Sequence, residues 1–153
     1  MKIIAVEGKS NIGKSTVIKN TIKDLITNEN FQVEWMRYSY IGRNPVDVID
    51  ERWFTNKHNV SDIRILLNIR GKTICIVSVG DSVKQIIDAY NRTMKHCSKT
   101  ECDLFVCACH PNSPARKKLD DLAKPDIVCI VNKTSINHDV QDELKNIILK
   151  TIL

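Results

Sequence analysis

Short apolar runs alternate with amphipathic stretches along the chain. Four runs are almost free of polar residues, which is typical of strands buried on both faces of a sheet. These runs cover residues 3–6, 74–79, 104–109 and 127–131. Residues 31–38 alternate loosely between apolar and polar side chains and are rich in β-forming types, so they are a further strand candidate.

Stretches with helical spacing lie between and after these runs. In the first the apolar positions are Val17, Ile18, Ile22, Leu25 and Ile26, and in the last they are Val140, Leu144, Ile147 and Ile148. Two further helices have start signals: Ser82 and Gln85 have the spacing of a capping box, and Ser113 precedes Pro114. We therefore expect four helices around the strands.

Strands that alternate with helices imply right-handed crossovers and a parallel sheet covered on both faces. We expect a three-layer α/β/α fold with a mostly parallel sheet of about five strands. A chain of 153 residues is sized for one domain, so residues 1–153 are taken as a single unit. Residues 39–72 are the least clearly patterned part. There Trp53 and residues 63–69 suggest one or two helices, which would form a substrate or partner insert.

Composition narrows the class of protein. Hydrophobic residues make up 42% of the chain and charged residues 27%, which is typical of globular proteins and excludes fibrous or disordered ones. The net charge of +5 suits an anionic ligand, but we find no dedicated nucleic-acid-binding motif.

The apolar runs also bear on location. They are far shorter than the roughly 18 residues of a membrane span. Glu7 and Lys9 interrupt the N-terminal run before it could serve as a signal peptide. We expect a cytoplasmic protein without a membrane span. Its six cysteines are then better explained as reduced thiols than as disulfides.

The clearest motif lies between the first strand and the first helix. Residues 8–15 match G-x-x-x-x-G-K-[ST] at every fixed position. The phosphate-binding candidates are Gly8, Lys9, Ser10, Asn11, Ile12, Gly13, Lys14, Ser15 and Thr16. In such a loop, backbone N–H groups and the helix N-terminus surround the phosphates. Lys14 would contact the β- and γ-phosphates, Ser15 would bind Mg²⁺, and Thr16 would reach the α-phosphate.

Through this motif, known as Walker A, the chain resembles the P-loop NTPase superfamily. The resemblance implies a P-loop fold that binds ATP or GTP with Mg²⁺. Lys9 lies five positions before Lys14, where MinD/ParA-like ATPases carry a signature lysine that acts across a dimer. Ser10 and Asn11 replace the two middle glycines of that pattern. It therefore stays open whether Lys9 is a signature lysine or a variable loop residue.

P-loop proteins also carry an acidic residue at the end of a neighbouring strand, where it holds the metal. Asp81 is our candidate because it follows the run at 74–79 and Gly80. We therefore assign catalytic roles to Lys14 and Asp81 and metal binding to Ser15 and Asp81. The alternative for Asp81 is a helix cap, although Ser82 is better placed for that task.

Other positions carry weaker signals. Glu7 and Asp47 are secondary candidates for the metal. Asn132 and Lys133 resemble the start of the guanine-binding N-K-x-D of GTPases, but Ser135 stands at the acidic position, so the base stays open.

The segment around Arg116 resembles an arginine-bearing helix of small P-loop kinases. The stretch between Arg116 and Asp126 is too short to contain the lid insertion of such kinases. Arg116, Lys117 and Lys118 would then be either a solvated basic face or a contact for phosphate or a partner. The spacing of His96, Cys97 and Cys102 does not match a zinc site, nor does that of Cys107, Cys109 and His110.

We therefore expect Mg²⁺-dependent binding of a nucleoside triphosphate, with ATP as the first candidate. Hydrolysis of the γ-phosphate would be coupled to a conformational or partner event. One alternative is a P-loop phosphotransferase whose acceptor is a nucleoside, nucleotide or other small molecule. A second alternative is a non-catalytic nucleotide-binding module. The oligomeric state is left open.

Overall fold

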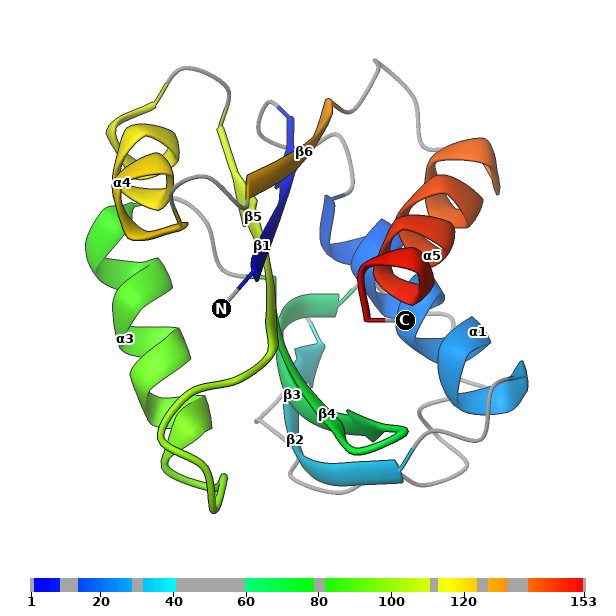
Figure 1. Cartoon of the computed structure of the whole chain (residues 1–153). Helices are drawn as coiled ribbons and strands as arrows, with labels where there is room; N and C mark the ends of the chain where they lie inside the picture. The colour runs from blue at the N-terminus through cyan, green and yellow to red at the C-terminus, as the bar shows by residue number, and fades with distance from the viewer. Residues whose placement is uncertain are drawn as a thin grey trace.

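The computed structural model describes residues 2–8, 14–28, 32–40, 60–78, 82–110, 113–123, 127–131 and 138–152 (Figure 1). The strands are β1 (Lys2–Glu7), β2 (Gln32–Tyr40), β3 (Val60–Ile69), β4 (Lys72–Val77), β5 (Leu104–Cys109) and β6 (Ile127–Val131). The helices within these ranges are α1 (Lys14–Asn28), α3 (Val83–Met94), α4 (Pro114–Ala123) and α5 (His138–Ile152).

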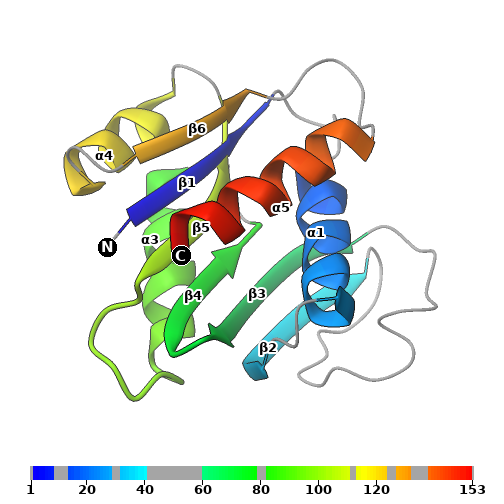
Figure 2. The same cartoon turned by 45° about the vertical axis from the view of Figure 1, so that its right-hand side comes forward.

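The strands form one mixed sheet with the order β2-β3-β4-β5-β1-β6 (Figure 2). β1 lies between β5 and β6 and is parallel to both, and β4 is parallel to β5. β3 is antiparallel to both of its neighbours, β2 and β4. The half of the sheet that contains β2, β3 and β4 is therefore an antiparallel meander.

This topology corrects the expected fold class. The prediction of a three-layer α/β/α P-loop fold with a mostly parallel sheet of about five strands is wrong. The sheet is mixed and has six strands among the described residues. The physical reason is that β3 and β4 are joined by a tight turn rather than by a crossover helix, and a tight turn forces antiparallel pairing.

The turn between β3 and β4 consists of Arg70 and Gly71. Both have positive φ, 50° and 82°, as a two-residue type I′ hairpin requires. The Gly71 N–H also donates a hydrogen bond to the Asn68 Oδ1 at 3.1 Å. Residues 63–69, expected to be helical, therefore lie in β3, and this expectation for the 39–72 segment is wrong.

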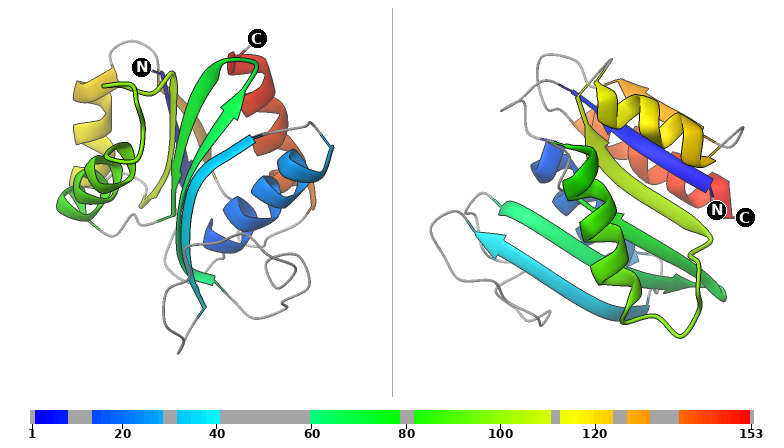
Figure 3. Two further views of the ribbon diagram at one scale, coloured as in Figure 1. Left: turned by 90° about the horizontal axis from the view of Figure 1, so that it is seen from below. Right: turned by 90° about the vertical axis from the view of Figure 1, so that its left-hand side faces the viewer.

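Helices cover both faces of the sheet (Figure 3). One apolar core lies between the sheet and helices α1 and α5. It includes Ile4 and Val6 of β1, Ile22 of α1 and Ile148 of α5. A second core lies on the opposite face, under α3 and α4, and includes Ile3 of β1. Successive residues of β1 thus face different cores, which explains its unbroken apolar run.

Several local predictions are confirmed. β5 and β6 have the limits that the apolar runs indicated, and β1, β2 and β4 differ from their predicted limits by only one or two residues. α3 follows Ser82 and α4 begins at Pro114, as the cap signals predicted. None of the described helices combines the length and the apolar character that crossing a bilayer requires.

Candidate functional site

The candidate site lies where β1 and β5 end side by side. Glu7, the last residue of β1, is in register with Cys109, the last residue of β5. The Gly8 N–H then donates a hydrogen bond to the Cys109 carbonyl at 3.1 Å. The first residue of the G-x-x-x-x-G-K-[ST] motif is thereby held at the carboxyl edge of the sheet, beside the end of the buried strand β5.

The C-terminal part of the motif opens α1. Lys14 is the first residue of this helix, and its Nζ donates a hydrogen bond to the Gly8 carbonyl. Ser15 and Thr16 follow in the first turn, and all three side chains are partly exposed. Although they are six residues apart, Gly8 and Lys14 therefore lie together, with the N-terminus of α1 beside them.

The remaining predicted positions lie outside the described residues. They are Lys9, Ser10, Asn11, Ile12 and Gly13 of the motif, the metal candidates Asp47 and Asp81, and residues 132–135. The structure thus brings together Gly8, Lys14, Ser15 and Thr16.

β4 is the strand that precedes the metal candidate Asp81 in the sequence. Directly after β4, the Ser78 N–H donates to the Ile63 carbonyl at 2.9 Å, and the Ile63 N–H donates to the Ser78 Oγ at 2.8 Å. Ser78 and β3 are therefore tied at this end of the strand. Because β4 is parallel to β5 and β5 to β1, the carboxyl ends of all three strands point to the same edge.

An ion pair joins the end of β1 to α4. The Arg116 Nε donates to the Glu7 Oε1, and only 16% and 11% of the two side chains are exposed. Arg116 is therefore not part of a solvated basic face, which corrects that alternative for it. Lys117 and Lys118 are exposed, as expected for such a face.

The first turn of α4 is held by Ser113. Its Oγ accepts a hydrogen bond from the Arg116 N–H at 3.2 Å and donates one to the His110 carbonyl at 2.7 Å. His110 follows directly after β5. The backbone of Arg116 is therefore anchored to the end of β5, which fixes the position from which its side chain reaches Glu7.

The sequence did not predict this pairing, although each of the two residues carries a signal of its own. Glu7 was a secondary metal candidate and Arg116 belonged to a basic helix face. A usable signal was present: Glu7 ends one buried strand, and Arg116 lies in the first turn after another. The register of β1 and β5, which brings these ends together, was the missing information.

Four of the five cysteines whose side chains the structure describes are buried. Cys75, Cys102, Cys107 and Cys109 are buried and Cys97 is partly buried. Burial raises the pKa of the Cys75 thiol well above its usual range and that of Cys102 to about 11. Within the described ranges, no group of three or more His, Cys, Asp or Glu side chains could hold a metal ion.

No family model, curated protein or solved structure matches this chain. What the chain does must therefore be inferred from its own residues and their geometry. The Gly8–Lys14 contact at the start of α1 and the Glu7–Arg116 ion pair beside it are the chemically informative features at this edge.

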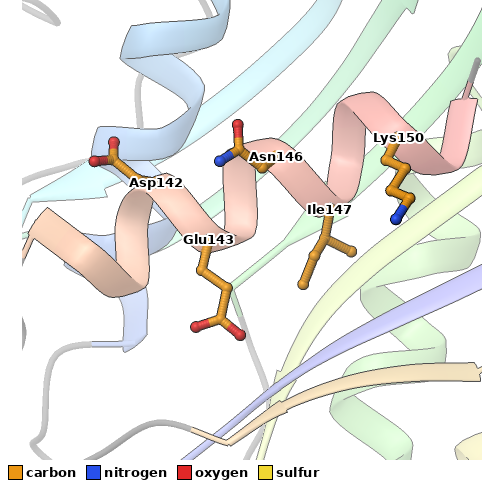
Figure 4. Close-up of a pocket in the computed structure, with 5 residues that line it drawn as sticks. All are labelled: Asp142, Glu143, Asn146, Ile147 and Lys150. Carbon is orange, nitrogen blue, oxygen red and sulfur yellow. The ribbon is translucent and has the colours of Figure 1, made fainter.

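A separate hollow of about 510 Å³ runs along α5 (Figure 4). The residues that line it are Asp142, Glu143, Asn146, Ile147 and Lys150. Both charge signs are present, and none of these residues belongs to the phosphate-binding motif. The hollow is therefore not assigned to the candidate site.

Proposed function

We propose that this protein binds a nucleoside triphosphate together with Mg²⁺ at the loop that joins β1 to α1, and that it hydrolyses the γ-phosphate. ATP is our first candidate for the nucleotide. The observation that carries the proposal is the contact between the Lys14 Nζ and the Gly8 carbonyl. It places a cation over the first residue of the loop at the N-terminus of a 15-residue helix. Cations and helix N-termini both favour bound phosphate.

Lys14 is well suited to contact the β- and γ-phosphates in this proposal. Its ammonium group donates a hydrogen bond to the Gly8 carbonyl, and a phosphate oxygen is a stronger acceptor than a neutral carbonyl because it is charged. The side chain is partly exposed, so it can move toward a ligand without leaving a buried position.

Among the residues that the structure describes, we assign Mg²⁺ binding to Ser15. Its hydroxyl belongs to the first turn of α1, next to Lys14, and is partly exposed. Mg²⁺ prefers oxygen ligands and usually keeps several waters, and phosphates supply further ligands, so one or two protein oxygens suffice. Bound Mg²⁺ would neutralise phosphate charge, and Asp81 remains the proposed second metal-side residue.

The surroundings of β1 are compatible with this assignment even though the sheet is mixed. The helix that follows β1 in the chain, α1, covers one face of the sheet, and the helix that follows β5, α4, covers the other (Figure 3). In open α/β sheets, ligands bind beyond the carboxyl ends of strands at such a divergence. The proposal thus depends on the local strand, loop and helix unit and not on the order of the remaining strands.

Calorimetry with Mg²⁺ and a non-hydrolysable ATP analogue tests the binding step. Lys14→Ala should weaken binding by about 1.5–3 kcal/mol, the range of a charged hydrogen bond. Lys117→Ala is the control because it removes an exposed lysine of α4. Equal affinities for wild type and Lys14→Ala would refute the assignment of the site.

The fate of the γ-phosphate tests the reaction. With labelled ATP and Mg²⁺, we expect free phosphate from the wild-type protein and a strongly reduced rate from Lys14→Ala. Label transferred to an added acceptor would instead identify a phosphotransferase. Binding without turnover would identify a nucleotide-dependent binding module.

A further inference from the structure

We propose that Arg116 neutralises Glu7 so that the phosphate loop can accept an anion, which makes Arg116 a positioning residue for nucleotide binding. This inference rests on the proposed function. It assigns a role to an ion pair that lies next to the motif but is not part of it.

The position of Glu7 creates the need for neutralisation. Its side chain is only 11% exposed and belongs to the residue directly before Gly8, where the loop begins. A carboxylate with little access to water is poorly screened, so it repels a nearby anion more strongly than an exposed carboxylate does. At about 10 Å and an effective dielectric constant of about 20, repulsion between two unit charges weakens binding about tenfold.

Arg116 supplies the compensating charge from a fixed place. The guanidinium remains protonated at all ordinary pH values, and its Nε donates directly to the Glu7 Oε1. Ser113 holds the Arg116 backbone to the end of β5. With the arginine in place, the pair presents no net charge beside the loop, and the charge of Lys14 acts on the ligand without opposition from Glu7.

A purely structural ion pair would give a different pattern. Loss of either partner would then disturb the same contact between β1 and α4, and both single substitutions would weaken nucleotide binding. Under the proposed role the two substitutions have opposite effects. Removing Arg116 leaves a buried negative charge beside the loop, whereas removing the charge of Glu7 leaves a positive one.

The experiment compares wild type, Arg116→Gln, Glu7→Gln and the double variant by calorimetry with Mg²⁺ and non-hydrolysable ATP or ADP analogues. We expect Arg116→Gln to bind the triphosphate about tenfold more weakly, and Glu7→Gln to bind it at least as tightly as wild type. The double variant should return to within about threefold of wild type. The loss in Arg116→Gln should be smaller for the diphosphate, because fewer charges are repelled. Lys118→Gln and Glu143→Gln are matched controls, since both residues are exposed.

The outcomes separate this inference from the proposed function. If wild type binds the triphosphate and Lys14→Ala weakens binding, but Glu7→Gln and Arg116→Gln weaken it equally, only the role of the ion pair is overturned. If wild type does not bind, both are overturned. Should Arg116→Gln fail to fold, Arg116→Lys must keep near-wild-type affinity because it keeps the charge. Glu7→Gln alone still decides the matter, since weaker binding by that variant contradicts the proposal.

Discussion

The Ser82 Oγ accepts a hydrogen bond from the Gln85 N–H at 3.2 Å, and this contact starts α3. Ser82 has the extended backbone of an N-cap residue, with φ −146° and ψ 158°. The cap is therefore provided by Ser82, and Asp81 is not needed for it. This separation of tasks makes the proposed metal-side role of Asp81 testable by substitution.

We predict that Asp81→Asn raises the Mg²⁺ concentration needed for nucleotide binding or turnover while leaving the melting temperature of the ligand-free protein nearly unchanged. Ser82→Ala is the matched variant: loss of the cap should cost about 1 kcal/mol of unfolding free energy without changing the Mg²⁺ requirement. Magnesium titrations and thermal unfolding of both variants measure the two effects. A large destabilisation by Asp81→Asn with intact Mg²⁺ dependence would show that Asp81 has a structural role instead.

Lys9 distinguishes two modes of nucleotide binding. We expect Lys9→Ala to cost about 1 kcal/mol or less in nucleotide affinity, as for a screened surface charge, because Ser10 and Asn11 break the glycine pattern of the signature-lysine loop. Light scattering with Mg²⁺ and a non-hydrolysable ATP analogue provides the measurement. A nucleotide-dependent dimer in wild type that is lost in Lys9→Ala would contradict this prediction and place Lys9 at a subunit interface.

We predict that Asp103 makes the stability depend on pH. The Thr73 N–H donates to its Oδ2 at 2.8 Å, and this hydrogen bond, with Lys99 at 3.6 Å, lowers the pKa of the carboxyl group. When the pKa of a carboxyl group is lower in the folded than in the unfolded protein, its charge stabilises the fold at every pH above the pKa of the unfolded state. That stabilisation is lost as the pH falls through the folded value.

Asp103→Asn should therefore lower the unfolding free energy at about pH 7 by about 0.5–1 kcal/mol, a small value because the side chain is 39% exposed. The difference from wild type should shrink at about pH 3. Urea unfolding at both pH values measures it, with Asp88→Asn on the exposed face of α3 as control. An equal difference at both pH values would show that the charge of Asp103 is not involved.

The cysteines should differ in reactivity. Among the five whose side chains are described, Cys97 is the only one that is not buried. Burial keeps Cys75 and Cys102 protonated by raising their pKa values, and the thiolate is the reactive form. With iodoacetamide at about pH 8, mass spectrometry should find Cys97 alkylated first among these five, and Cys97→Ser should remove that fast reaction. Earlier labelling of Cys102 would contradict the prediction.

Much of the local structure follows from neighbouring residues in the sequence. The apolar runs at 104–109 and 127–131 predicted the limits of two strands because strands buried on both faces need apolar side chains at every position. Ser82 and Ser113 predicted two helix starts because capping involves residues only three positions apart. The G-x-x-x-x-G-K-[ST] motif was recognisable for the same reason.

The antiparallel half of the sheet was within reach of the sequence but was misread. Ile63, Ile65, Leu67 and Ile69 alternate with a period of two, and all four face the core beneath α1 and α5. Gly71 marks the hairpin turn that follows. Leu66 made the segment look helical because it is also apolar, although it faces the opposite core. A strand buried on both faces weakens the alternation that identifies strands.

The sequence alone determined most of the local elements, two helix starts and the G-x-x-x-x-G-K-[ST] motif, since each depends on residues close together in the chain. Only the tertiary structure decided the strand order, the antiparallel direction of β3 and the ion pair between Glu7 and Arg116. The two residues of that pair are 109 positions apart, and they meet because β5 pairs with β1 and places α4 over its end. Pairing between distant strands depends on the packing of the whole chain, which no local pattern encodes.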